Sequence, residues 1–285
     1  MYIRNPVEWS LDQIKFAGTT IETLVTRRGG QELRVAPTIR RIGFADIKDA
    51  LAKGLTDFAA FRDDVVLICI VYPVAGLVLA RLIFGDGLLP LVFPLGSGFA
   101  LIGPFAAVLL YEMSRRREQG LDVSWGDGFG LLRSPAFGAI LVLGLALMAL
   151  FLLWLGTAWG IYALTLGPEP PASIRSFVHD VLTTERGWAM IVIGISVGFL
   201  FAVVALAVGV VSFPLLVDRQ VRLTTAVKTS IDAVIANPGT MALWGLVVAG
   251  SLVLGSIPLL VGLIVVMPVL GHATWHLYRK VVVLD

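Results

Sequence analysis

Two histidines near the C-terminal end of the chain have the spacing of a shared ligand pair. His272 and His276 lie four residues apart, so a helix places both imidazoles on one face. Two such imidazoles can hold Zn²⁺ or Cu²⁺, and the internal repeat described below places Glu112 opposite His276 as a third ligand. We expect no cofactor, and a metal ion at His272, His276 and Glu112 is the candidate that this spacing leaves open. The alternative is that both histidines hydrogen-bond neighbouring polar groups.

A run of three arginines could bind anions. Arg115, Arg116 and Arg117 follow directly on a long apolar segment. At that position they could contact anionic lipid headgroups or a phosphorylated ligand. The alternative is that they only anchor the topology of the chain, as basic residues beside membrane spans commonly do.

Other chemistry has little support in the sequence. The residue pattern predicts no Ser/His/Asp set, Walker loop or metalloprotease helix. The glycines at 96, 98 and 103 have the wrong spacing for a nucleotide loop, and no strand precedes them. We expect no catalytic residues, no enzyme activity and no nucleic-acid partner.

The composition of the chain indicates whether these residues lie in water or in a membrane. Hydrophobic residues make up 57% of the 285 residues and charged residues 15%, with a mean hydropathy of +0.88. A soluble domain carries about 25% charged residues and cannot bury this much apolar surface. The first residues do not form a cleaved secretory signal, because charged residues interrupt them. Most of the chain therefore belongs in lipid.

The apolar runs predict an all-α, polytopic membrane helix bundle. A span needs about 20 apolar residues; four runs meet this and a fifth run supplies two short spans, so that six spans form three hairpins at about 65–111, 137–217 and 241–278. The turn at 255–258 divides the last hairpin. We predict a cytoplasmic N-terminal arm over residues 1–62 and a six-helix membrane domain over 63–285.

The basic residues predict the orientation. The arm, the connectors after the second and fourth spans and the C-terminal tail carry most of the Lys and Arg, whereas Arg175 and Arg186 lie in a connector on the other side. Basic residues concentrate in cytoplasmic loops. Both termini are therefore predicted in the cytoplasm, as an even number of spans also requires.

Three segments outside the spans have the periodicity of amphipathic surface helices. They cover about residues 11–25, 174–182 and 223–236. Each is short, with apolar residues on one side and polar residues on the other. We predict that they lie on the membrane surface, and helices that bind a partner would show the same pattern.

An internal repeat relates the first and last hairpins. Aligned without gaps, Pro94 matches Pro258, Pro104 matches Pro268 and Arg115 matches Arg279. The same register pairs Glu112 with His276. We predict three copies of one unit, a surface helix followed by a membrane hairpin, all in the same orientation. Because such units are not inverted repeats, they weaken the case for an alternating-access transporter.

The chain also resembles a known family. The residues that carry the resemblance are the arm at 3–9, the run at 46–58, the block at 103–117 and the Gly-His-Ala-Thr-Trp-His-Leu-Tyr-Arg ending at 271–279. They resemble the integral membrane proteins of domain of unknown function 2189. The resemblance implies a bacterial inner-membrane protein, some relatives of which are labelled cytochrome c oxidase subunits. A catalytic haem-copper subunit needs about six histidines, and this chain has three.

These observations predict a non-enzymatic scaffold or accessory component of a membrane complex. Its expected partners are membrane lipids, a respiratory or other membrane complex, or further copies of the chain. Two alternatives stay open at this point. One is a transporter or channel for a small solute or lipid, and the other is a metal- or haem-linked respiratory factor using His272 and His276.

Overall fold

The computed structural model describes residues 37–283 apart from 71–72, 79–80, 82–87, 122, 124–133 and 220, and gives no side-chain positions for 62–69 and 99. The predicted amphipathic segment at 11–25 and the predicted turn at 85–87 lie outside the described residues. The described elements, in chain order, are β1 (Thr38–Ile39), α2 (Phe44–Cys69), η1 (Leu89–Leu91), α4 (Val92–Ala106), α5 (Val108–Glu118), α7 (Phe137–Thr165), α8 (Ile174–Thr183), α9 (Glu185–Gly209), α10 (Ser212–Asp218), α11 (Leu223–Ala236), α12 (Pro238–Ser256), α13 (Leu263–Val281) and β2 (Val282–Val283).

The fold is an all-α membrane helix bundle. Among the described residues, four helical segments are long and apolar enough to cross a membrane: Leu89–Ala106, Phe137–Thr165, Glu185–Asp218 and Pro238–Ser256. They correspond to four of the six predicted spans. Part of the first predicted span lies outside the described residues. The sixth corresponds to α13, which is not among the four and carries both histidines of the predicted pair.

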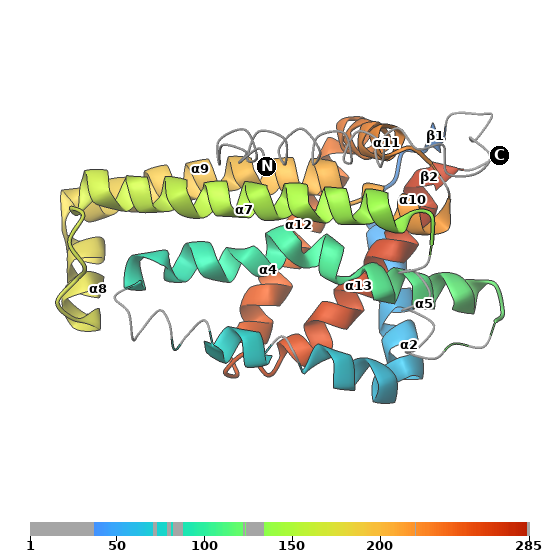
Figure 1. Cartoon of the computed structure of the whole chain (residues 1–285), viewed down its shortest axis with the longest axis horizontal. Helices are drawn as coiled ribbons and strands as arrows, with labels where there is room; N and C mark the ends of the chain where they lie inside the picture. The colour runs from blue at the N-terminus through green and yellow to red at the C-terminus, as the bar shows by residue number, and fades with distance from the viewer. Residues whose placement is uncertain are drawn as a thin grey trace, which may run out of the picture.

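The helices α7 and α9 run side by side, and α8 lies across one of their ends (Figure 1). A capping box starts α8, because the Ser173 hydroxyl accepts from the Ser176 N–H and the Ser176 hydroxyl accepts from the Ser173 N–H, both at 3.1 Å. The corner into α9 needs a glycine, since a Cβ on Gly187 would lie 2.2 Å from the Asp180 carbonyl oxygen. The predicted amphipathic helix at 174–182 is thus confirmed as a helix.

The opposite end of the bundle holds α10, α11 and both short strands (Figure 1). The strands β1 and β2 pair antiparallel, with Thr38 opposite Val283. Asn237 joins them to α12, because its side-chain oxygen accepts from the Ile42 N–H at 2.8 Å and its amide donates to the Arg40 carbonyl at 3.2 Å. Residues 38–43 and the last described residues therefore lie at one end of the molecule, as an even number of crossings between them requires.

The most extensive helix contact is between α2 and α13, and it includes a close backbone approach. A Cβ on Gly54 would lie 2.6 Å from the backbone nitrogen of Ala273, so only glycine permits this approach. Elsewhere two of the predicted continuous runs are interrupted. The helix from Val92 breaks at Ala107, three residues after Pro104, and α9 ends at Gly209 before α10 begins at Ser212.

Candidate functional site

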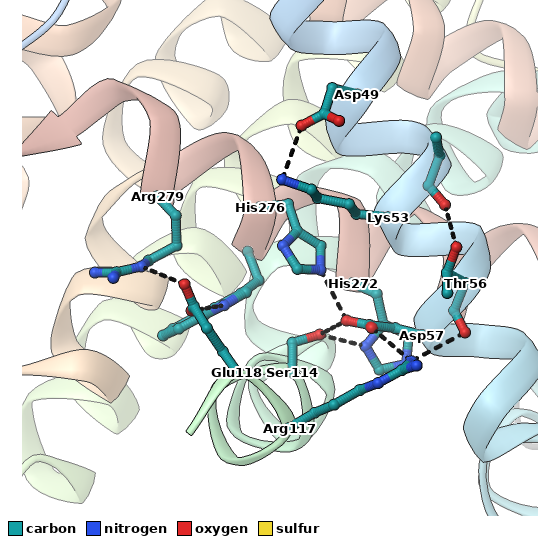
Figure 2. Close-up of polar contacts among 12 residues, drawn as sticks. Asp49, Lys53, Thr56, Asp57, Ser114, Arg117, Glu118, His272, His276 and Arg279 are labelled. Atoms are coloured by element: carbon teal, nitrogen blue, oxygen red, sulfur yellow. Dashed lines mark hydrogen bonds and ion pairs between the residues drawn. The ribbon is translucent and has the colours of Figure 1, made fainter. Parts of the chain in front are cut away.

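Five polar residues meet where α2, α5 and α13 come together. We call Asp57, Ser114, Arg117, His272 and His276 the Asp57 cluster (Figure 2). Three segments far apart in sequence supply them: Asp57 comes from α2, Ser114 and Arg117 from α5, and the histidines from α13. The four-residue spacing of the histidines on α13 turns both rings toward the same neighbours, as their sequence spacing predicted.

The Asp57 carboxylate is the centre of the cluster. Its Oδ2 accepts from the Ser114 hydroxyl at 2.6 Å and lies 2.8 Å from His276 Nε2, while its Oδ1 accepts from Arg117 Nη1 at 2.8 Å. Arg117 also donates to the Thr56 carbonyl at 3.0 Å and lies over the Phe61 ring. The carboxylate is thus buried with a charge partner and further donors, which is the condition under which a buried charge is tolerated.

Burial raises the pKa of Asp57, but hydrogen bonds from His276 and Ser114 outweigh it, and the net effect is a lowered pKa. The carboxylate is therefore ionised. An ionised carboxylate only accepts hydrogen bonds, so the Ser114 proton points to Asp57. The Ser114 oxygen then accepts from His272 Nδ1, which lies 2.8 Å away.

This network assigns the tautomer of His272. With its proton on Nδ1, the Nε2 atom of the ring carries a lone pair. His272 is completely buried, and its Nε2 has no hydrogen-bond partner among the described residues. A buried polar atom without a partner is uncommon and calls for an explanation.

The cluster is not a nucleophilic triad. Such a triad places the histidine between serine and acid, so that the imidazole can take the serine proton. Here the serine lies between Asp57 and His272, and its proton faces the carboxylate. The fold brings this serine, histidine and aspartate together, although the sequence indicated no such set, and the arrangement is not that of a nucleophilic triad. In this order it links three helices.

The predicted third metal ligand lies elsewhere. Glu112 accepts from Arg115 at 2.7 and 2.8 Å and from Arg116 at 3.0 Å. The carboxylate beside His276 is Asp57 instead, on a helix that the repeat register did not consider. Within the described part of the chain, no group of three or more His, Cys, Asp or Glu residues has an arrangement that could hold a metal ion.

The three predicted anion-binding arginines all have partners within the chain. Arg115 and Arg116 pair with Glu112, and Arg117 pairs with Asp57. Their side chains remain partly exposed, by 27% to 37%. Two carboxylates of the bundle, Glu112 and Asp57, thus pair with all three guanidinium groups, and the partly exposed positions are those expected of residues at the edge of a membrane.

Further hydrogen bonds and an ion pair lie beside the Asp57 cluster on α13. Glu118 accepts from Trp275 Nε1 at 3.1 Å and from Arg279 at 3.2 Å, and Asp218 accepts from the Tyr278 hydroxyl at 2.8 Å. Sequence reasoning singled out neither Asp57 nor Ser114. The available signal was a carboxylate near the end of the run at 46–58, which carries part of the family resemblance, but the sequence does not show which helix faces it.

Part of the chain matches a known protein family. Residues 92–218 match the family described as "predicted integral membrane protein (DUF2189)". This confirms over α4 to α10 the resemblance found in the sequence. The match contains Ser114 and Arg117, whereas Asp57 and the two histidines lie outside it. No curated protein and no solved structure matches the chain.

Proposed function

We propose that this integral membrane protein is a non-enzymatic scaffold or accessory component of a membrane complex, with both termini in the cytoplasm of a bacterial cell. One observation carries the proposal. In the span Glu185–Asp218, 6% of the apolar window is buried within the chain, against 33% in the span of α7. The helix α9 therefore offers an apolar face along most of its length, and a further transmembrane helix could pack there.

The outward face of α9 also offers a place for close approach. In the described structure, a Cβ on Gly194 would meet no atom within 4 Å, whereas one on Gly198 would lie 3.0 Å from Trp154 of α7. These two glycines are four residues apart in the sequence, as in a Gly-x-x-x-Gly motif; Gly198 is used inside the bundle and Gly194 is left open. Membrane helices pack closely where such small residues occur. The partner in this proposal is another membrane protein or a second copy of the chain.

The experiment is purification in mild detergent from cells that express the tagged chain at its native level. The proposal expects a complex larger than one chain. It further expects Gly194→Leu to reduce the recovered partner at least several-fold, while Gly156→Leu, at an equally open position of α7, does not. A monodisperse monomer without a partner would contradict the proposal.

A metal-linked accessory role is a second candidate, favoured by the unpartnered Nε2 of His272. A lone pair on a buried imidazole nitrogen is a suitable metal ligand. Metal analysis of purified wild type against the double variant His272→Ala plus His276→Ala tests it. Equal metal content in the two proteins would remove this candidate.

A further inference from the structure

The turn between α12 and α13 consists of apolar residues that face away from the protein. Ile257, Leu259 and Val261 are 72%, 80% and 56% exposed, and between them lie only Pro258 and Leu260. Turns in water usually contain Gly, Asn, Asp or Ser because these residues suit tight turns and bind water. The connection between α7 and α9 is of that polar kind, with Glu169, Ser173 and Arg175 among its residues.

The backbone N–H groups of the turn are hydrogen-bonded within the turn itself, as a solvent that offers no hydrogen bonds requires. Leu259, Leu260 and Val261 each donate their N–H to a carbonyl of the same turn, at 2.9, 3.1 and 3.0 Å, and Pro258 has no N–H to satisfy. The Ser256 hydroxyl donates to the Leu252 carbonyl at 2.8 Å. In lipid, backbone polar groups must be satisfied internally, and this turn meets that requirement at all these groups.

The depth of the turn follows from the Asp57 cluster. The hydrogen bond between Ser114 and His272 fixes α5 and α13 at one level. Partly exposed charges gather there, including Arg117 at 37% and Arg279 at 36%. Because an exposed charge is expensive in hydrocarbon, this level lies at the edge of the membrane.

Two helical stretches leave this level, one from Ser114 and one from His272, and they reach very different depths in the membrane. The helices from Leu89 to Ser114 comprise 26 residues and extend up to about 38 Å, which is enough to cross a hydrocarbon layer of about 30 Å. On α13, by contrast, His272 lies ten positions after Gly262, where the turn ends, and this distance corresponds to about 15 Å of helix. In Figure 1 the turn accordingly lies apart from α8, which caps the far ends of α7 and α9.

We propose that α12 and α13 form a re-entrant hairpin, which enters and leaves the bilayer on the side of β1 and β2 and whose apolar tip, 257–261, ends among the lipid acyl chains. Although α12 alone has the length of a span, its chain returns from the membrane interior. Gly255 and Gly262 allow α12 and α13 to approach each other closely, since a Cβ on Gly262 would lie 2.6 Å from the Gly255 carbonyl oxygen. The interaction surface at the tip is therefore specific for hydrocarbon, not for water or headgroups.

Single cysteines on a Cys69→Ser background test this proposal. Leu259→Cys reports the tip, Ala172→Cys the connection at α8, and Thr224→Cys the end with α11; all three positions are exposed. In sealed vesicles, an impermeant maleimide is expected to label Thr224→Cys from one side, Ala172→Cys from the other and Leu259→Cys from neither. Labelling of Leu259→Cys from the same side as Ala172→Cys would overturn the proposal.

A second measurement gives a positive signal. A bimane dye is attached to Leu259→Cys in detergent, and the protein is then reconstituted with lipids brominated either near the chain end or near the headgroup. Chain-end bromines are expected to quench the dye at least twofold more strongly than headgroup-proximal bromines. Stronger quenching near the headgroup would refute a buried tip. Ile257→Cys, at a neighbouring exposed position, provides the same readout if Leu259→Cys does not fold.

Discussion

The α7–α9 pair and the α2–α13 pair are held together by different means. Between α7 and α9, Trp154 packs against Phe201, with ring centroids 5.4 Å apart, and lies close to Gly198. Its indole N–H donates to Ser97 of α4 at 2.9 Å. Trp154 thus makes an apolar contact with α9 and one neutral hydrogen bond to α4.

Between α2 and α13, by contrast, backbones approach closely at Gly54 and a buried charge lies one helical turn away, at Asp57. The difference follows from the surroundings. An unpaired charge in hydrocarbon has a large free-energy cost, so the helices in the middle of the bundle associate through close packing of apolar side chains. At the membrane edge a carboxylate and an arginine can pair inside the protein and still reach the headgroups. We therefore predict that removing the buried charge between α2 and α13 lowers the stability of the protein more than removing a polar group beside α7.

The largest effect is expected from Asp57→Ala. This substitution leaves Arg117, Ser114 and His276 without their shared acceptor. Breaking a buried pair costs about 3 kcal/mol of unfolding free energy, the low end of the usual range because Arg117 can turn toward water. Unfolding in detergent micelles measures it. Asp49→Ala, two turns earlier on α2, removes pairs with the exposed Lys53 and the partly exposed Lys280. Because Asp49 itself is exposed, the loss should be less than about 1 kcal/mol. Equal losses would contradict the comparison.

Next in size is Gly54→Ala. The added methyl group meets the backbone of Ala273, which cannot move without shifting α13. We expect a loss of about 2 kcal/mol, as for other overpacked sites. The matched control is Gly156→Ala on α7, where the described structure leaves open space; the better helix propensity of alanine should make it neutral or stabilising by up to about 1 kcal/mol. If both variants melt alike, close approach does not hold the α2–α13 pair.

A smaller effect is expected from Ser97→Ala in the apolar region. The indole of Trp154 then loses its acceptor, which in membrane proteins costs about 0.6 kcal/mol on average. Ser196→Ala is the control, since the Ser196 hydroxyl donates only within its own helix, to the Val192 carbonyl. Melting temperatures of the two variants should separate by a few degrees at most. A loss as large as that of Asp57→Ala would show that polar contacts also dominate between α7 and the helices beside it.

The smallest effect concerns pH. Hydrogen bonds from Lys280 and Lys53 lower the pKa of Asp49 to about 2 from its ordinary value of 3.8. A lowered folded-state pKa means that the stabilisation is present above about pH 4 and is lost as the pH falls toward 2. Because Asp49 is half-exposed, the contribution is below about 1 kcal/mol. The melting-temperature difference between wild type and Asp49→Asn should therefore shrink between pH 6 and pH 3; a difference that grows would contradict this assignment.

Local pattern predicted many of the elements. The helices α8 and α11 have nearly the predicted bounds, and the predicted turn at 255–258 falls where α12 ends. These features depend on periodicity and on turn residues within a few positions of each other. The break at Ala107 was not predicted, although Pro104 was noted, because tertiary packing decides whether a proline bends a helix or ends it.

Composition and residue order by themselves determined that lipid is the main solvent of the chain, that the chain folds into helices and that basic residues lie at the helix ends. The tertiary structure alone decided which polar groups meet. His276 and Asp57 are 219 positions apart, and the helical period shows which face of α13 carries the histidine but not which helix lies opposite. That choice depends on a close approach at Gly54 and on the match of charges across it, and both are properties of two surfaces in contact.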